Sequence, residues 1–420
     1  MISGESVTTE SSPRLLSHLG STYYPLAMMG RLPFAMTVVG VLTLVVTVTG
    51  SFTDAGATSA VVGIGTAVAG PFLGMAADRF GQRVVLLAST LVHSLALVAL
   101  TVLTYQHRPV GVLMAAAFVI GASAPQLAAM SRARLLSIIN LKLPSHVRSR
   151  TLNRTMSVES MADELVFVFG PVAVGVLSVQ IAPWAPLVVA AALTLVCVGG
   201  FALHPTASVV RRAEHSAPTG SLRDVLSAKI LVLAAGMLSI GTFFGSMLTS
   251  LTSFMDDRGA GDSAGVVYGA LGIGSAIFAI AVVLFPASFT LAARWIVFAL
   301  VSLVSVVFLP TIHSVPAMVA VLVVLGIGLG PTLVTIFSLG SARAPVGRSA
   351  TVMTILSSAV VVGQSLLTAV TGRVVDAFGT SVSMWFPIGS VVLMVLFGLW
   401  NARIERIERG IQTASLPSDR

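Results

Sequence analysis

Residues 70–87 read GPFLGMAADRFGQRVVLL and join two long apolar runs through a short turn. The residues that mark this turn and its flanks are Gly74, Asp78, Arg79, Gly81 and Arg83. Gly81 permits a tight turn because glycine adopts backbone conformations that are closed to other residues. The charged side chains stand where the chain leaves an apolar environment. The stretch therefore predicts two membrane helices joined by an interfacial loop, with arginines whose charged heads reach water.

The composition of the whole chain supports a membrane protein. Hydrophobic residues make up 55% of the 420 residues, charged residues only 10%, and the mean hydropathy is +0.97. Soluble domains carry about 25% charged residues. The net charge is +8, but the basic residues are scattered in short segments between apolar runs. This distribution excludes a nucleic-acid-binding face.

Twelve apolar runs are long enough to cross a bilayer, since about 20 apolar residues span its hydrocarbon layer. The predicted spans are 31–53, 55–77, 84–104, 109–131, 152–178, 184–203, 229–255, 263–286, 292–311, 315–340, 350–376 and 384–402. The longest internal polar segment divides them six and six. The predicted organisation is an N-terminal tail (1–30), a six-helix bundle (31–203), a central loop (204–228), a second six-helix bundle (229–402) and a C-terminal tail (403–420).

The basic residues also predict the orientation. One set of loops collects residues 132–154 and the arginine-rich C-terminus, whereas the other keeps Arg108, Arg258 and Arg373. The first set belongs in the cytoplasm by the positive-inside rule, which places both termini there. We expect a multi-pass protein of a bacterial cytoplasmic membrane.

The two bundles resemble each other in sequence. Spans five and eleven both follow a basic segment, begin with Arg and small or hydroxylated residues, and reach a glycine flanked by Val or Phe. Two related halves predict a pseudo-symmetric transporter whose substrate site lies between them.

Residues 70–87 resemble the signature Gly-x-x-x-Asp-Arg-x-Gly-x-Arg of the major facilitator superfamily. The matching residues are Gly74, Asp78, Arg79, Gly81 and Arg83. Ala76 stands where Leu is common, and Gln82 where a basic residue is common. The resemblance implies an all-α fold of twelve transmembrane helices, with two bundles that rock around a central cavity. It also implies a cytoplasmic gate in which Asp78 contacts the start of span eleven, at residues 348–351.

Span five carries three acids, Glu159, Asp163 and Glu164. Asp163 lies about 16 Å along the helix from the start of the span, close to the bilayer centre, and shares a helix face with Glu159. An ionised Asp there costs roughly 2.5–3.5 kcal/mol, so the acids must face a cavity, pair with cations or take up protons. We expect Asp163 and Glu164 to couple transport to protons. The alternative is an internal ion pair with Arg31 or Arg154, which we favour for Glu159.

Two further features bear on the direction of transport. The segment GPVAVG, with Gly170, Pro171 and Gly175, partly resembles the fifth-span motif of antiporters in the superfamily, and Pro171 predicts a bend in the helix. Drug–proton antiporters often carry an arginine in span four, but residues 118–121 offer none. If protons drive this chain, the acids of span five must act in another way.

Four other side chains are candidates for the cavity wall. They are Gln126, Phe243, Phe244 and Gln364. Each is also explained by helix packing or an interhelical hydrogen bond. No ATP-binding loop, metal-ligand cluster or nucleophile motif occurs, so we expect neither an enzyme nor a metal site, and no cofactor beyond the proton gradient.

The leading hypothesis is a proton-coupled exporter of a small amphipathic or cationic compound, monomeric in the lipid bilayer. Uptake or facilitated exchange of a sugar or other metabolite is the alternative within the same fold. A membrane receptor that transports nothing is the alternative of another class.

Overall fold

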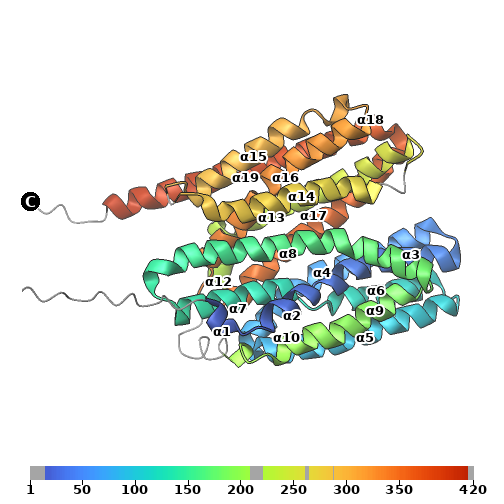
Figure 1. Ribbon diagram of the computed structural model, residues 1–420, viewed down its shortest axis with the longest axis horizontal. Helices are drawn as coiled ribbons and strands as arrows, with labels where there is room; N and C mark the ends of the chain where they lie inside the picture. Colours follow the sequence, from blue (N-terminus) through green and yellow to red (C-terminus); the bar gives the residue numbers. More distant parts are fainter. Residues whose placement is uncertain (1–14, 209–220, 261–263, 287, 415–420) are drawn as a thin grey trace, which may run out of the picture.

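The computed structural model describes residues 15–208, 221–260, 264–286 and 288–414, and these residues form helices and loops without strands. Figure 1 shows two groups of long, roughly aligned helices that lie side by side. We call residues 15–208 the N-terminal half and residues 221–414 the C-terminal half.

The helices of the N-terminal half follow one another through short connections. They are α1 (Leu15–Leu19), α2 (Tyr23–Met29), α3 (Leu32–Thr49), α4 (Phe52–Phe80), α5 (Gln82–Tyr105), α6 (Val110–Ala122), α7 (Leu127–Lys142), α8 (Ser145–Gln180), α9 (Ala185–Leu193), the π-helical turn η1 (Thr194–Val198) and α10 (Gly199–Leu203).

The C-terminal half has a similar series of helices. They are α12 (Leu222–Val225), α13 (Ala228–Asp256), α14 (Ala264–Ala281), η3 (Val282–Leu284), α15 (Leu291–Val306), η4 (Leu309–Thr311), α16 (Val315–Arg343), α17 (Ser349–Phe378), α18 (Thr380–Ser383) and α19 (Trp385–Ala414).

Among the described residues, ten helical stretches are long and apolar enough to cross a membrane, and Val266–Ala281 is a shorter apolar helix. Helix α8, which carries the acids, covers the predicted fifth span. In chain order these twelve segments correspond to the twelve predicted spans. The prediction of an all-α membrane protein is therefore confirmed.

The prediction for span four and the loop after it is wrong in one respect. Residues 123–126 are not helical, so the predicted span 109–131 consists of two helices, α6 and α7. Pro125 lies in this break, and it has no N–H to donate to a continuous helix. Helix α7 then continues to Lys142, so Arg132 lies inside a helix and not in a cytoplasmic loop.

Part of the predicted N-terminal tail is also helical. Helix α2 lies within residues 1–30 and directly precedes the first predicted span. The Tyr23 side chain is fully buried, and its hydroxyl lies 3.1 Å from the Ser131 hydroxyl of α7. Helix α2 is therefore packed into the N-terminal half.

Helices α4 and α17 bring the two halves into close contact. A Cβ added at Gly70 would collide with the Ser358 hydroxyl, and one added at Gly74 would collide with the Thr354 hydroxyl and the carbonyl of Ala350. At Gly74 glycine is needed because the backbone of α17 lies too near for a side chain, whereas at Gly70 the space is taken by the Ser358 side chain. Gly74 belongs to the signature segment, residues 70–87, that the sequence analysis identified.

We predict that Gly74→Val destabilises the protein by about 1–3 kcal/mol, because the added atoms overpack the interface between α4 and α17. Gly56→Val is the matched control in the same helix, since a Cβ added at Gly56 has no heavy atom within 4 Å. The measurement is the thermal unfolding midpoint of both purified variants. Equal midpoints would contradict the close contact.

Candidate functional site

Four charged side chains, three of them buried and one partly exposed, form a cluster in the N-terminal half. Arg31 lies between α2 and α3, Arg132 lies on α7, and Glu159 and Asp163 lie one turn apart on α8. We call these four residues the charged cluster. Two positive and two negative groups give it no net formal charge.

The ion pairs within the cluster form a chain. Arg31 Nη2 pairs with Glu159 Oε2, and Arg31 Nε lies 2.9 Å from Asp163 Oδ1. The other oxygen of Asp163 accepts a hydrogen bond of 2.5 Å from Arg132 Nη2. Each oxygen of Asp163 is thus held by a different arginine.

Glu159 is fixed from a second side by neutral groups. Its Oε1 accepts a hydrogen bond of 3.2 Å from the Ser131 hydroxyl, which in turn lies next to the Tyr23 hydroxyl. Arg31 also donates from Nη1 to the Ala27 carbonyl at 3.0 Å. The Glu159–Arg31 pair is therefore anchored within the N-terminal half alone.

The two acids of the cluster differ in the exposed fraction of their side chains. Glu159 is 1% exposed and Arg132 also 1%, whereas Asp163 is 27% exposed. Only Asp163 of the two borders a cavity that lies between the halves. Of the two acids of the cluster, Asp163 is therefore the one that a ligand or a water molecule in the cavity can reach.

The cavity has a volume of about 140 Å³ and is lined by both halves. The charged side chains on its wall are Arg31, Arg132 and Asp163. The C-terminal half contributes Met237, Phe244, Leu333, Phe337, Ser357, Val360 and Val361. The site therefore has a charged wall on one half and a mainly apolar wall on the other.

Arg132 connects the charged cluster to the C-terminal half. Its guanidinium carbon lies 3.8 Å from the centre of the Phe337 ring of α16, a distance at which a cation–π attraction is strong. Its Nε and Nη1 have no hydrogen-bond partner among the described residues. Arg132 was not a candidate in the sequence, because the hydropathy window placed it in a loop.

The structure also locates other residues that the sequence assigned to span five or to its ion pairs. Arg154 is exposed and forms no ion pair with the described side chains, so it is not the partner of Glu159. The side chain of Glu164 lies outside the described part of the structure. Helix α8 continues through Gly170, Pro171 and Gly175, and a Cβ added at Gly170 would meet Ala35 of α3.

The predicted wall residues divide into two groups. Gln126 and Phe244 line the cavity. Phe243 is fully buried in the core of the C-terminal half, and Gln364 does not border the cavity. Phe243 is therefore a packing residue, which is the alternative that the sequence analysis gave for it.

Asp78 holds the two halves together at one end of the molecule. Its carboxylate accepts hydrogen bonds from the backbone N–H of Ala350 at 3.0 Å and of Thr351 at 2.8 Å, and a further one from the Thr351 hydroxyl. These donors open helix α17, whose N-terminus attracts a negative charge. The predicted contact between Asp78 and residues 348–351 is confirmed.

The remaining signature residues surround this contact, which we call the gate. Gly81 has a φ of 89° and ends α4, in a conformation that favours glycine. Arg79 and Arg83 are exposed on either side of the turn. Gly74 allows the approach of α17 described above.

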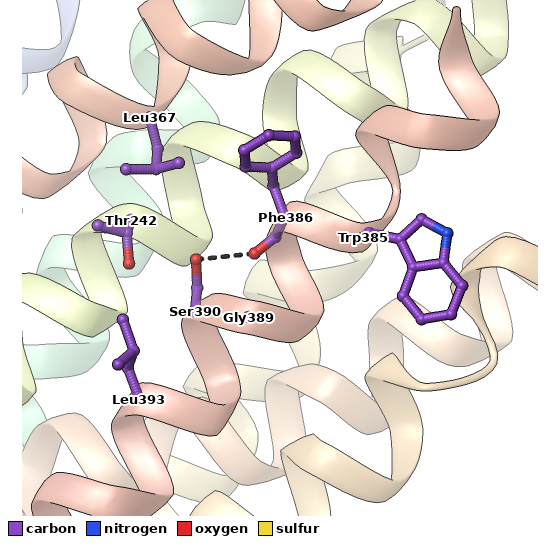
Figure 2. Close-up of a pocket in the computed structure, with 7 residues that line it drawn as sticks. All are labelled: Thr242, Leu367, Trp385, Phe386, Gly389, Ser390 and Leu393. Atoms are coloured by element: carbon purple, nitrogen blue, oxygen red, sulfur yellow. Dashed lines mark hydrogen bonds between the residues drawn. The ribbon is translucent and has the colours of Figure 1, made fainter. Parts of the chain in front are cut away.

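A second and larger cavity of about 470 Å³ lies in the C-terminal half alone. Figure 2 shows its lining, which comes from α13, α17 and α19 and includes Thr242, Leu367, Phe386 and Leu393. The Ser390 hydroxyl there donates to the Phe386 carbonyl at 3.0 Å, and Trp385 is 62% exposed. The lining has no charged residue, so we place the functional site at the smaller cavity.

Among the described residues, no group of three or more His, Cys, Asp or Glu side chains could hold a metal ion.

The comparison with protein families identifies one family for this chain. A model described as Major Facilitator Superfamily matches residues 24–368. The human organic anion transporter MFSD10 has a similar structure, with a TM-score of 0.68 and 15% identity over 92% of this chain and 100% of that one. No curated protein matches the chain in sequence.

Two further solved structures are similar. A bacterial homologue of the iron transporter ferroportin, in an outward-facing state with soaked iron, has a TM-score of 0.68 and 15% identity, over 90% of this chain and 98% of that one. The proton:xylose symporter XylE, bound to a bromo-deoxyglucose, has a TM-score of 0.66 and 14% identity, over 91% of this chain and 95% of that one. At these identities the likeness concerns the fold.

We predict that Glu159→Gln lowers the free energy of unfolding by roughly 3–5 kcal/mol, because it breaks a buried ion pair and leaves Arg31 undercompensated. Glu405→Gln is the control, since the Arg343–Glu405 pair is more exposed. The measurement is thermal unfolding of the purified variants. An unchanged midpoint together with lost transport would instead make Glu159 a coupling group.

We predict that Asp78→Asn opens the gate, because a neutral amide loses charge-assisted hydrogen bonds that contribute about 1.5–3 kcal/mol each. Spin labels at Val84 and Val346, both exposed beside the gate, report the separation in a Cys197→Ser background. Asp54→Asn, at the other end of α4, is the control. Identical distance distributions in both variants would argue against the gate.

Proposed function

Because the chain belongs to the Major Facilitator Superfamily, it is a membrane transporter and not an enzyme, and we propose that it carries a small compound by proton-coupled alternating access. In this proposal Asp163 is the coupling acid and the cavity between the halves is the cargo site. The energy source is a proton gradient, without a cofactor. The transporter acts as a monomer in the bilayer and has no nucleic-acid partner.

The proposed orientation is supported by the basic residues of the loops and by the resemblance of the gate segment to the family signature. We place the gate and both termini in the cytoplasm of a bacterial cell, with the protein in its cytoplasmic membrane. The gate contact holds the halves together on that side. Transport then requires Asp78 to release α17 so that the cavity opens to the cytoplasm.

The position of Asp163 is the observation that carries the proposal. It borders the cavity, and both its oxygens are held by arginines. Protonation of Asp163 would weaken two ion pairs and change the charge of the cluster from zero to +1. A single proton therefore changes both the cargo site and the side chain that stacks on Phe337 of the other half. Such a link between proton and conformation is what coupled transport requires.

Export is the first candidate direction, with an amphipathic or cationic cargo in exchange for protons. It is supported by the partial resemblance of residues 170–175 to an antiporter motif and by the apolar wall of the cavity. A cationic cargo has less support than the sequence suggested, because Asp163 is already compensated by Arg31 and Arg132.

Proton-coupled uptake of a metabolite is the second candidate. It is supported by the two arginines on the cavity wall, which face a single acid there. When Asp163 is protonated, the cluster becomes positive and attracts an anion. Proton and anion would then bind on the same side of the membrane and travel together.

We predict that Asp163→Asn abolishes proton-coupled transport while the protein stays folded, because the amide cannot exchange a proton. The measurement is the flux of protons and cargo in proteoliposomes, with an imposed pH gradient of either sign. Glu405→Gln is the control and retains coupling, because Glu405 is an ion-paired carboxylate that does not line the cavity. Full coupling in the Asp163→Asn variant would refute the proposal, and the sign of the proton flux that accompanies cargo distinguishes export from uptake.

A further inference from the structure

We propose that the cargo carries an oxyanion, such as a carboxylate or sulfonate, that binds the free donors of Arg132, while its apolar body contacts the C-terminal half. This inference assigns a substrate class to the cavity and rests on the proposed transport function. Four features of the cavity support it: unsatisfied donors of Arg132, the charge of its wall, the apolar surface opposite and its size.

Arg132 has N–H donors that make no hydrogen bond with the described residues. A guanidinium carries five N–H groups and no acceptor. Only Nη2 of Arg132 is used by Asp163, and Nε and Nη1 have no partner among the described residues although the side chain is 1% exposed. Leaving buried donors of a charged group unsatisfied costs more than a typical hydrogen bond gains. A ligand acceptor in the cavity would satisfy them, and an oxyanion would do so with charge-assisted bonds.

The ring of Phe337 does not take up the hydrogen bonds of these buried donors. It lies against the guanidinium carbon of Arg132 at 3.8 Å. Stacking of this kind occupies a face of the planar group, whereas the N–H bonds point outward in the plane. Phe337 thus fixes the orientation of Arg132 without competing for its hydrogen bonds.

The charge of the cavity wall favours an anion. The wall carries Arg31, Arg132 and Asp163, which sum to one positive charge. Glu159 completes the neutral cluster but is 1% exposed and does not border the cavity. A cationic cargo would have to displace an arginine from Asp163, whereas an anion meets an unused donor.

The wall formed by the C-terminal half determines the chemistry of the part of the cargo that is not the oxyanion. Leu333, Phe337 and Val360 of the C-terminal half border the cavity together with Met237 and Phe244. This surface suits an alkyl or aromatic body. The cavity volume of about 140 Å³ is below the roughly 300–1,000 Å³ of sites for drug-sized ligands, so the cargo that fits this conformation is small. The class is a small amphipathic anion.

The binding test uses the purified full-length protein at fixed pH without a gradient. The probes are butanesulfonate, which stays anionic at every accessible pH, and butyltrimethylammonium, which has the same chain and the opposite charge. We expect butanesulfonate, and not the ammonium compound, to raise the thermal unfolding midpoint. Stabilisation by the ammonium compound alone, or by neither probe at millimolar concentration, would overturn the inference.

Two variants of the charged cluster then locate the site. Arg132→Gln is expected to weaken butanesulfonate binding by about 10- to 100-fold, the loss of one charge-assisted interaction of 1.5–3 kcal/mol. Asp163→Asn is expected to strengthen binding, since it removes the competing carboxylate. The second variant keeps Arg132, so it tests the inference even where Arg132→Gln fails to fold.

Arg258→Gln is the matched control for the arginine. Arg258 also stacks on a phenylalanine, with its guanidinium carbon 3.5 Å from the Phe254 ring centre, but it does not border the cavity. Binding should be unchanged in this variant. Equal losses in Arg132→Gln and Arg258→Gln, or weaker binding in Asp163→Asn, would contradict an oxyanion site at Arg132. Binding by this site without proton-driven flux would instead refute the coupling proposal alone.

Discussion

The structure depends on the compensation of charge around Asp163. A charged side chain that is removed from water has to be paired, because its desolvation costs several kcal/mol even after relaxation. Here one carboxylate is paired with two arginines that come from different parts of the chain, and a second carboxylate balances the sum. Helices α7 and α8 and the segment before α3 must therefore stay together. The charges of the cluster are compensated within the N-terminal half.

The two halves contact each other through weaker and more reversible interactions. At the gate, Asp78 accepts backbone and hydroxyl hydrogen bonds from the start of α17. At the cavity, Arg132 stacks on Phe337. At the gate Arg348 of the C-terminal half also attracts Asp78, so both contacts have an electrostatic part but are smaller than the chain of ion pairs in the charged cluster. An interface of this kind suits a protein that alternates between two arrangements of nearly equal free energy.

The sequence predicted the gate more completely than the charged cluster, for a physical reason. The gate depends on a short segment in which spacing fixes geometry, so Asp78 was assigned its contact with α17 correctly. The cluster depends on tertiary packing. Arg132 follows the break around Pro125 and was counted as a loop residue, because hydropathy alone cannot separate a buried charge from a solvated one. Arg154 failed as a partner for Glu159 because five residues turn a helix by about 140°, which places the two side chains on different faces.

The charged cluster also changes how the acids of span five are interpreted. Three acids on an apolar helix suggest a site for a cation when they are counted alone. Arg31 and Arg132 lie beside Asp163 and neutralise most of the attraction that this carboxylate would have for a cationic ligand. What a cargo meets at the wall is the part of the network that remains unsatisfied, and the described part of that network offers N–H donors of Arg132. The proposed preference for an anion therefore depends on the hydrogen-bonding capacity that remains in a compensated cluster, because an unpaired polar group is costly in a low-dielectric cavity.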